Sequence, residues 1–409
     1  MTDFEIYALW KARHSSQPAP APVGNGSVRF IDYDGTITRA YTPAEFAELT
    51  ELPANPTHEG LTAQGWNWTL ADAKEYVTAN GALDIGQMYI TDDGKTRLYI
   101  SLEEGRLKPR LGIAINGTAV IDWGDDSITD TLTGSDLTTV EYNEHSYSVA
   151  GEYVVSIDVT GEFAFLGDAT NGSQVLTKTG GDANSNKVYL NALKKIEFGE
   201  NISEIGAHAF RNCTSIKEVA MPMTMTSIGA NAFQLCMSIE NVMIPKNITA
   251  LSNSVFYQCH SLKRMSIPKD VSTIGASAFN SCYSLEKIDI PQKVYYIGAN
   301  GFIACYAMSN MILSSRLTTL SVNVFQNCAA ITSVTIPSAI TTINANAFSG
   351  CYGLSFIKFE GSTPPTVADA SAWTNIPTDC VIYVPTGSLS NYTSANNYPN
   401  SSTYAYREY

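Results

Sequence analysis

The sequence predicts a mainly β protein with short helices, in which a solenoid of 23-residue repeats follows a β-sandwich and a small α+β module. Seven phenylalanines recur every 23 residues from Phe210 to Phe348, and a cysteine stands three places after each. After each cysteine, apolar residues follow at the spacing of a short strand, as at Leu285, Ile288 and Ile290. A repeat of this length buries its apolar side chains only against its neighbours, so the pattern predicts stacked coils.

Composition narrows the functional classes. The 409 residues carry 39 acidic and 25 basic side chains, a net charge of -14. An acidic surface repels nucleic acid and anionic lipid, so we expect no nucleic-acid partner and no membrane insertion. The length favours several domains. We expect an N-terminal helix and Pro-rich linker at 1–27, an α+β docking module at 28–108, a β-sandwich with its connection at 109–190, seven repeats at 191–360 and a C-terminal capping unit at 361–409.

The sequence of residues 1–27 predicts a docking element. Residues 3–14 favour a short apolar helix, and the prolines at 18–22 favour a semi-rigid spacer. A frayed terminus is the alternative. The first residues lack the basic start, long apolar stretch and cleavage site of a secretory signal. If the chain is complete, we therefore expect it not to use the general secretory route.

Residues 28–108 predict a compact α+β module that begins with a strand. Helices are expected to open at Thr42 and Thr69, because each is a hydroxyl residue with an acid three places on. Two alternating runs at 87–91 and 96–102 are joined by Asp-Asp-Gly-Lys. This arrangement predicts a β-hairpin.

Residues 110–165 resemble a PKD-type β-sandwich. The resemblance is carried by Val-Ile-Asp-Trp-Gly-Asp at 120–125, His-Ser-Tyr at 145–147 and Gly-Glu-Tyr-Val-Val at 151–155. Asp126 replaces the glycine usual after Trp-Gly-Asp, so this turn is expected to differ. The resemblance implies a spacer or binding domain.

The repeats resemble the BspA-like branch of the leucine-rich repeats over about 191–360. One unit reads Ala-Phe-Asn-Ser-Cys-Tyr-Ser-Leu at 278–285. Residues 361–365 and 380–389 resemble the closing unit common in that family. The resemblance implies recognition of surfaces and not catalysis.

Seven of the eight cysteines occupy one repeat position, which predicts a column of small buried thiols. Stacked coils bring such residues within disulfide range by Cα distance, but parallel inward side chains rarely offer the required dihedral. A zinc site would need close Cys-x-x-Cys pairs, and the sequence has none. We expect no metal site and no cofactor.

One motif points towards chemistry. Residues 30–37 (Phe-Ile-Asp-Tyr-Asp-Gly-Thr-Ile) resemble the nucleophile motif of haloacid-dehalogenase-like phosphotransferases, which implies Asp32 as nucleophile and Asp34 as acid/base. Residues 166–172 loosely resemble that family's magnesium loop, but Gly172 stands where the second acid belongs. The expected β-sandwich also replaces the alternating strands and helices of that family. We therefore favour a strand that runs into an Asp-Gly turn, and expect no enzyme.

Tyrosines mark the expected ligand surface in the later repeats, where outward strand positions change from charged to neutral. Tyrosine with serine and asparagine suits adaptable recognition of protein or glycan. The alternative is that these rings cover the edges of the solenoid. The candidate contact residues are Tyr283, Tyr295, Tyr296, Tyr306 and Tyr352.

These features predict a non-enzymatic recognition protein whose partner is a cell-surface protein or glycan. The leading hypothesis is a phage or prophage tail-associated protein that binds the bacterial host surface, with its N-terminal module attached to a virion or tail structural protein and with homo-oligomers as an option. The runner-up is a bacterial cell-surface adhesin, and a haloacid-dehalogenase-like phosphatase comes third. The expected location is the virion or the cell surface.

Overall fold

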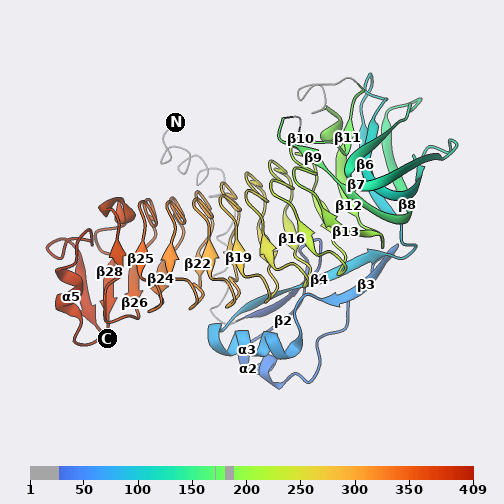
Figure 1. The fold of residues 1–409 in the computed structure, drawn as a ribbon. Helices are drawn as coiled ribbons and strands as arrows, with labels where there is room; N and C mark the ends of the chain where they lie inside the picture. Colours follow the sequence, from blue (N-terminus) through green and yellow to red (C-terminus); the bar gives the residue numbers. More distant parts are fainter. Residues whose placement is uncertain (1–26, 171, 180–187) are drawn as a thin grey trace.

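A long solenoid carries a β-rich domain at one end and a small α+β module along one side (Figure 1). The computed structural model describes residues 27–170, 172–179 and 188–409. The chain is mainly β with short helices, as predicted. The expected helix at 3–14 and the proline spacer at 18–22 lie outside the described residues.

The coils place their strands in two parallel rows, which we call the first and the second sheet, and about nine turns stack at the 23-residue spacing. Within each row the hydrogen-bonded ladders run in short groups, such as β16-β18 and β17-β19-β21. The first sheet begins with β12 (Leu193–Glu197) and ends with β29 (Ala405–Glu408). Between them lie the strands that follow the cysteines: β14 (Glu218–Ala220), β16 (Asn241–Met243), β18 (Arg264–Ser266), β20 (Lys287–Ile288), β22 (Asn310–Met311), β24 (Ser333–Ile336), β26 (Phe356–Phe359) and β28 (Val381–Val384). The second sheet contains β13 (Ile202–Ile205), β15 (Ser227–Ile228), β17 (Ala250–Leu251), β19 (Thr273–Ile274), β21 (Tyr296–Ile297), β23 (Thr319–Leu320), β25 (Thr342–Ile343) and β27 (Thr366–Val367). The predicted solenoid is confirmed.

Two columns of side chains fill the interior. Successive phenylalanines from Phe210 to Phe348 stack with ring centroids 5.1 to 5.8 Å apart. Beside them, the six repeat thiols from Cys236 to Cys351 each donate to the carbonyl oxygen of the phenylalanine one coil earlier, as Cys282 does to Phe256 at 3.2 Å. All eight cysteines are buried and free, which confirms the expected column of thiols.

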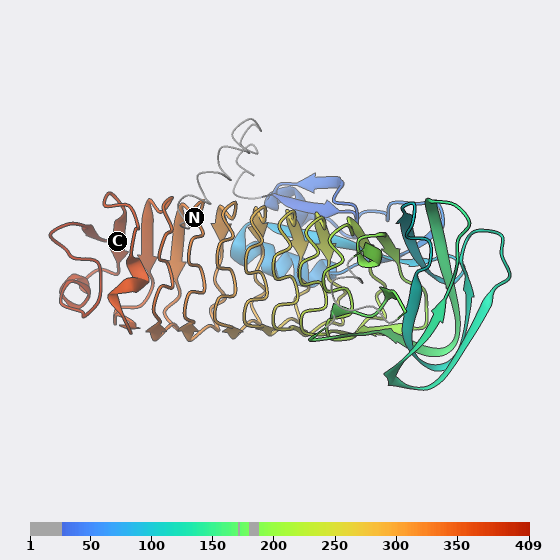
Figure 2. The same cartoon turned by 90° about the horizontal axis from the view of Figure 1, so that it is seen from above.

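Upstream strands cap the start of the solenoid, and Figure 2 shows them at the opposite end from α5. They are β5 (Thr96–Leu102), β6 (Arg110–Asp122), β7 (Asp130–Glu144), β8 (Gly151–Phe165), β9 (Gly167–Asp168), β10 (Gly172–Ser173) and β11 (Leu176–Thr177). β5 pairs antiparallel with β12, and the end of β8 pairs with β13. Both sheets of the solenoid are thereby continued into this domain. No comparison confirms a PKD-type fold for these strands.

The α+β module comprises β1 (Val28–Ile31), β2 (Ile37–Tyr41), α2 (Pro43–Glu48), β3 (Leu61–Trp66), α3 (Leu70–Asn80) and β4 (Leu83–Thr91). Its sheet has the order β2-β1-β4-β3. The predicted N-caps are confirmed, since Thr42 forms a capping box with Glu45 and Thr69 accepts from the Asp72 amide. The predicted hairpin is wrong. β4 and β5 form around the Asp-Asp-Gly-Lys turn, but β4 stays in the module sheet while β5 pairs with β8 and β12.

The closing segment covers the other end of the solenoid with a 3₁₀ helix η1 (Ala370–Trp373) and α5 (Leu389–Thr393). Trp373 takes the next place in the ring column, 5.5 Å from Phe348. Tyr392 is fully buried and donates to the carbonyl oxygen of Gly361. These aromatic side chains bury the apolar interior that the last coil would otherwise expose.

Candidate binding surface

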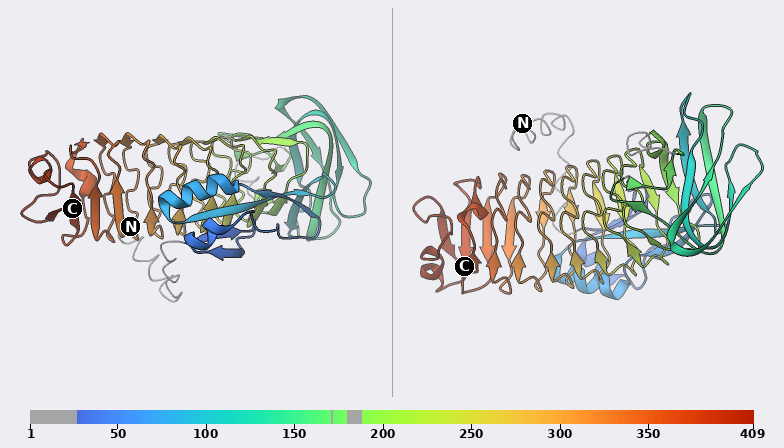
Figure 3. Two further views of the ribbon diagram at one scale, coloured as in Figure 1. Left: turned by 90° about the horizontal axis from the view of Figure 1, so that it is seen from below. Right: turned by 45° about the horizontal axis from the view of Figure 1, so that its top comes forward.

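The α+β module lies on the outward face of the first sheet. β4 crosses β14, β16 and β18, and its nine residues are all buried. Leu83 and Ile85 join the core beneath the module's helices, whereas Met88, on the opposite side of β4, packs on Met243 of β16. Figure 3 shows that the module covers the green and yellow coils and leaves the orange and red coils uncovered.

Hydrogen bonds to the backbone of the coils fix this docking. The indole of Trp68 donates to the carbonyl oxygen of Ile267 at 3.1 Å, and the amide of Asn67 donates to Ile244 at 2.9 Å. Ser266 donates to the carbonyl oxygen of Asp84 at 2.7 Å. These buried contacts make the module part of the folded solenoid.

A buried charge cluster marks the far edge of the interface. Arg29 binds Asp84 through two nitrogens at 2.8 and 2.6 Å, while Lys287 of β20 lies 2.8 Å from Asp289 and 3.6 Å from Asp84. Asp289 also accepts from the Asp84 amide at 2.9 Å. Burial opposes ionisation, yet Lys287 and Arg29 hold the pKa of Asp84 below its ordinary value. The two cations and two carboxylates therefore neutralise each other.

The α+β module covers the first sheet only as far as β20. One outward repeat position holds Met243, Ser266 and Asp289 in successive coils, and all three are buried beneath the module. The same position three coils after Ser266 is Thr335, which is exposed. The first sheet therefore has a covered half and a free half.

The free half presents aromatic and basic side chains. We name as the free sheet surface the outward residues of β24, β26, β28 and β29 together with the C-terminal ring, namely Thr335, Phe356, Lys358, Tyr383, Arg407 and Tyr409. The Phe356 side chain is 37% exposed and meets the Tyr383 ring edge-on at 5.9 Å. The Lys358 ammonium lies 4.2 Å from the centre of the Tyr409 ring. This arrangement can contact a ligand over several strands of a flat sheet.

Residues 184–374, a little under half of the chain, match six copies of the BspA type leucine rich repeat region. The repeats are BspA-type leucine-rich repeats. This assignment confirms the resemblance that their phenylalanine and cysteine spacing indicated. No curated protein matches the chain.

Several solved leucine-rich repeat structures are similar to part of this chain. A leucine-rich repeat protein from Bacteroides ovatus is 21% identical over 56% of this chain and 59% of its own, with a TM-score of 0.42. A leucine rich cell surface protein from Faecalibacterium prausnitzii is 23% identical over 48% and 80%, with a TM-score of 0.27. The T. pallidum leucine rich repeat protein is 22% identical over 44% and 73%, with a TM-score of 0.32.

The BspA-type coils place the five candidate tyrosines in two separate regions. Tyr283 stacks between His260 and Tyr306 along the turns that follow the cysteines, and Tyr306 is only 2% exposed. Tyr352 is partly buried against the same cluster. Tyr295 and Tyr296 lie at β21 of the second sheet and are 55% and 49% exposed. Burial of Tyr306 removes it from any contact surface, and a ligand role for the other four stays a prediction.

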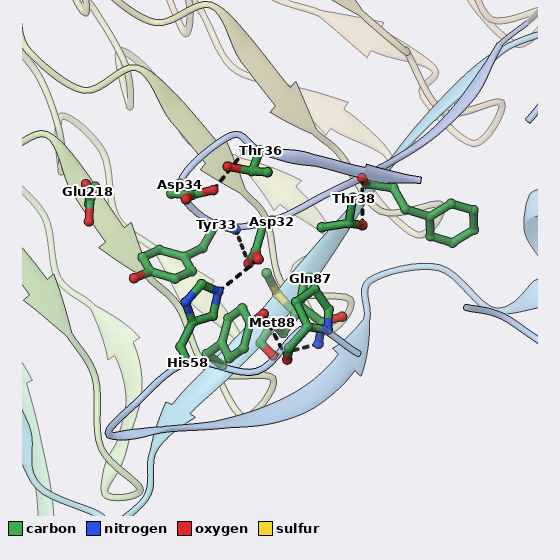
Figure 4. A network of polar contacts seen from close by, with 12 residues as sticks. Asp32, Tyr33, Asp34, Thr36, Thr38, His58, Gln87, Met88 and Glu218 are labelled. Atoms are coloured by element: carbon green, nitrogen blue, oxygen red, sulfur yellow. Dashed lines mark hydrogen bonds and ion pairs between the residues drawn. The ribbon is translucent and has the colours of Figure 1, made fainter. Parts of the chain in front are cut away.

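The aspartate motif forms a turn at the end of β1 (Figure 4). Asp32 is 3% exposed, with one carboxylate oxygen 2.8 Å from His58 Nε2 and the other accepting from the Tyr33 amide. Asp34 accepts from the Thr36 amide. This is the predicted strand running into an Asp-Gly turn, in which His58 and the Tyr33 amide occupy the two carboxylate oxygens of Asp32. Among the described residues, no cluster of His, Cys, Asp or Glu could hold a metal ion.

Sequence reasoning missed the free sheet surface and the covered half. Arg264 and Lys287 looked like outward residues of the early repeats. In the structure Lys287 belongs to the buried charge cluster, and Arg264 lies 3.5 Å from the carbonyl oxygen of Gly35 in the module. The acidic composition of residues 28–91 was the one available signal that this segment complements basic coils.

Within the described residues, no helix is long and apolar enough to cross a membrane.

Proposed function

We propose that this chain is a bacterial surface recognition or adhesion protein that contacts its ligand through the free sheet surface. The observation that carries the proposal is the division of the first sheet. Half of its outward face binds the chain's own module, and the other half presents exposed rings and cations without any described segment on it. Aromatic and arginine side chains are enriched at interfaces, and the free half presents Phe356, Tyr383 and Arg407.

The repeat type supports an adhesin, which was the second hypothesis from sequence. Nothing in the comparisons favours a tail-associated protein, so attachment to a virion is not part of the proposal. We place the chain at the cell surface and assign it no catalytic role, in keeping with the burial of Asp32.

Two measurements test this proposal. Quantitative mass spectrometry of the producing bacterium should find the chain enriched in washed envelopes and not in purified phage particles. Enrichment in particles alone would return the tail-associated hypothesis to first place.

The second measurement is binding of the labelled full chain to bacterial or host cells. Replacing Phe356 and Tyr383 by alanine should reduce binding, because both rings are outward on the free sheet surface. The matched control is Tyr295→Ala with Tyr296→Ala, which removes two exposed rings from the second sheet. Loss of binding in the control and not in the first variant would move the contact surface to the tyrosines predicted from sequence.

A further inference from the structure

We propose that the free sheet surface binds an acidic glycan, a polysaccharide that carries carboxylates. This inference rests on the proposed function and names the ligand class of the same site. The first observation concerns two cations of this surface, Lys358 and Arg407. Lys358 pairs in register with Tyr383, which pairs in register with Arg407. The tyrosine ring therefore stands between a lysine and an arginine, each one strand away, at roughly 4.8 Å per strand.

Both cations lack an acidic partner. Among the described residues, no carboxylate lies within ion-pair distance of Lys358 or Arg407, whereas Lys287 and Arg29 in the covered half are neutralised. Glu408, next to Arg407, is used elsewhere because its carboxylate accepts from the amides of Gly387 and Leu389. Two cations without a carboxylate partner, one on either side of Tyr383, on a chain of net charge -14 favour an anionic ligand.

The aromatic rings of the free sheet surface indicate a ligand that also has apolar faces. Phe356 and Tyr383 hold each other edge-on, and Tyr409 is fixed by donating to the carbonyl oxygen of Phe359 at 3.1 Å. Fixed rings present apolar faces at low entropic cost. Sugar rings also have apolar C–H faces, and uronic acids add carboxylates at their edges. Alternating rings and cations therefore match a polyuronate chain.

The sheet geometry disfavours a peptide as the ligand. A peptide strand binds a sheet by pairing with a free edge. In β26 and β28 the backbone groups already pair with neighbouring strands on both sides. β29 ends the sheet and pairs with β28 alone, but over β26 and β28 recognition must come from side chains, which suits a ligand bound through ring faces and carboxylates.

The test measures binding of the full chain to polygalacturonate, with dextran as a neutral polymer and polyglutamate as an acidic peptide. We expect binding to polygalacturonate that weakens at high salt, and no binding to dextran. Replacing Lys358 and Arg407 by glutamine should weaken binding at least about tenfold, because each loses a charged hydrogen bond. The matched control is Lys246→Gln with Arg316→Gln, which removes the same charge from exposed residues outside the surface and should leave binding unchanged.

Absence of polygalacturonate binding, or equal binding by the two double variants, overturns the inference. Stronger binding of polyglutamate than of polygalacturonate also overturns it and assigns the surface to an acidic protein. The cell-binding assay separates these failures from that of the proposed function. A chain that binds cells but not polygalacturonate has the wrong ligand class here, whereas a chain that binds neither loses both proposals.

Discussion

Each coil turns through two residues in the left-handed region of backbone space. One lies two places before the phenylalanine, with φ between 53° and 60°, and the other two places after it, with φ between 58° and 74°. Asparagine and glycine adopt this region at little cost, and other residues are strained there. Asn300, Asn323 and Asn346 also join side chains, since each later amide donates to the preceding one at 2.8 and 3.0 Å.

The backbone of Leu235 is strained, because its φ of 64° lies in the left-handed region. We expect Leu235→Asn to raise the free energy of unfolding by about 0.5 to 1 kcal/mol through relief of this strain. Urea denaturation measures the change. Gln234→Asn is the control, since residue 234 is not in the left-handed region and should gain nothing.

The phenylalanine column predicts a large loss of stability when one of its side chains is truncated. Phe279 is fully buried between Phe256 and Phe302. Phe279→Ala should therefore lower the free energy of unfolding by about 3 to 5 kcal/mol, measured in urea. Phe356→Ala removes the same side chain from the free sheet surface and should cost less than about 1 kcal/mol. Equal losses in the two variants would contradict the role of the column.

The thiol column makes stability fall at alkaline pH. Burial raises the pKa of Cys213 and Cys351 from 9.0 to about 12. The unfolded chain therefore ionises these thiols first, so their stabilising contribution is complete below pH 9.0 and is lost as pH rises through about 12. We expect the urea midpoint to fall over this interval. Cys351→Ala should show a smaller fall, and an identical fall would contradict this assignment.

Among the elements, β4 shows how tertiary contacts set the role of a strand. It is buried on both faces, with helices on one side and the coils on the other. The close approach needs Gly86, because a Cβ there would lie 2.7 to 3.0 Å from the Met243 side chain. The charge cluster then sets the position of the module along the coils. Removing one partner from such a buried cluster is destabilising, because it leaves an uncompensated charge away from water.

The buried charge cluster predicts weaker docking of the module when one of its charged side chains is removed. Lys287→Met leaves Asp84 and Asp289 buried with Arg29 as the one cation still in ion-pair contact among the described residues, and should weaken docking of the module by about 3 to 5 kcal/mol. Hydrogen exchange of the β4 amides measures the docking. Lys263→Met is the control, because its pair with Glu240 is solvent-exposed and contributes less than about 1 kcal/mol. Unchanged protection of β4 in Lys287→Met would show that the cluster does not hold the module.

At the scale of the whole molecule, two upstream parts and one downstream part each cover a different region of the solenoid. β5 and β8 extend its two sheets and so protect its first coil. The module covers the outward face of the early coils, and the closing segment buries the last coil. On the first sheet, the outward face beyond β20 is the part that no described segment covers, and this division links the fold to the proposed function.

Two tryptophan substitutions at one repeat position test this division. Ser266→Trp places a large ring under the module, where Ser266 is 1% exposed, and should destabilise the chain by about 3 kcal/mol or more. Thr335→Trp makes the same type of change on the free half and should alter stability by less than about 0.5 kcal/mol. Thermal unfolding with proteolysis of the module measures both. Comparable losses at the two positions would mean that the free half is also covered in solution.

The sequence by itself determined the repeat length, the two inward columns and the helix caps at Thr42 and Thr69. These follow from local spacing, because a coil or a cap is completed by residues close in the chain or one repeat away. The partners of β4 and β5 and the coverage of the early coils were decided only by tertiary structure. They depend on contacts such as Asp84 with Asp289 and Trp68 with Ile267, about 200 residues apart. Burial of this kind leaves no periodic signal in the chain, so the free sheet surface becomes visible only once the module is docked.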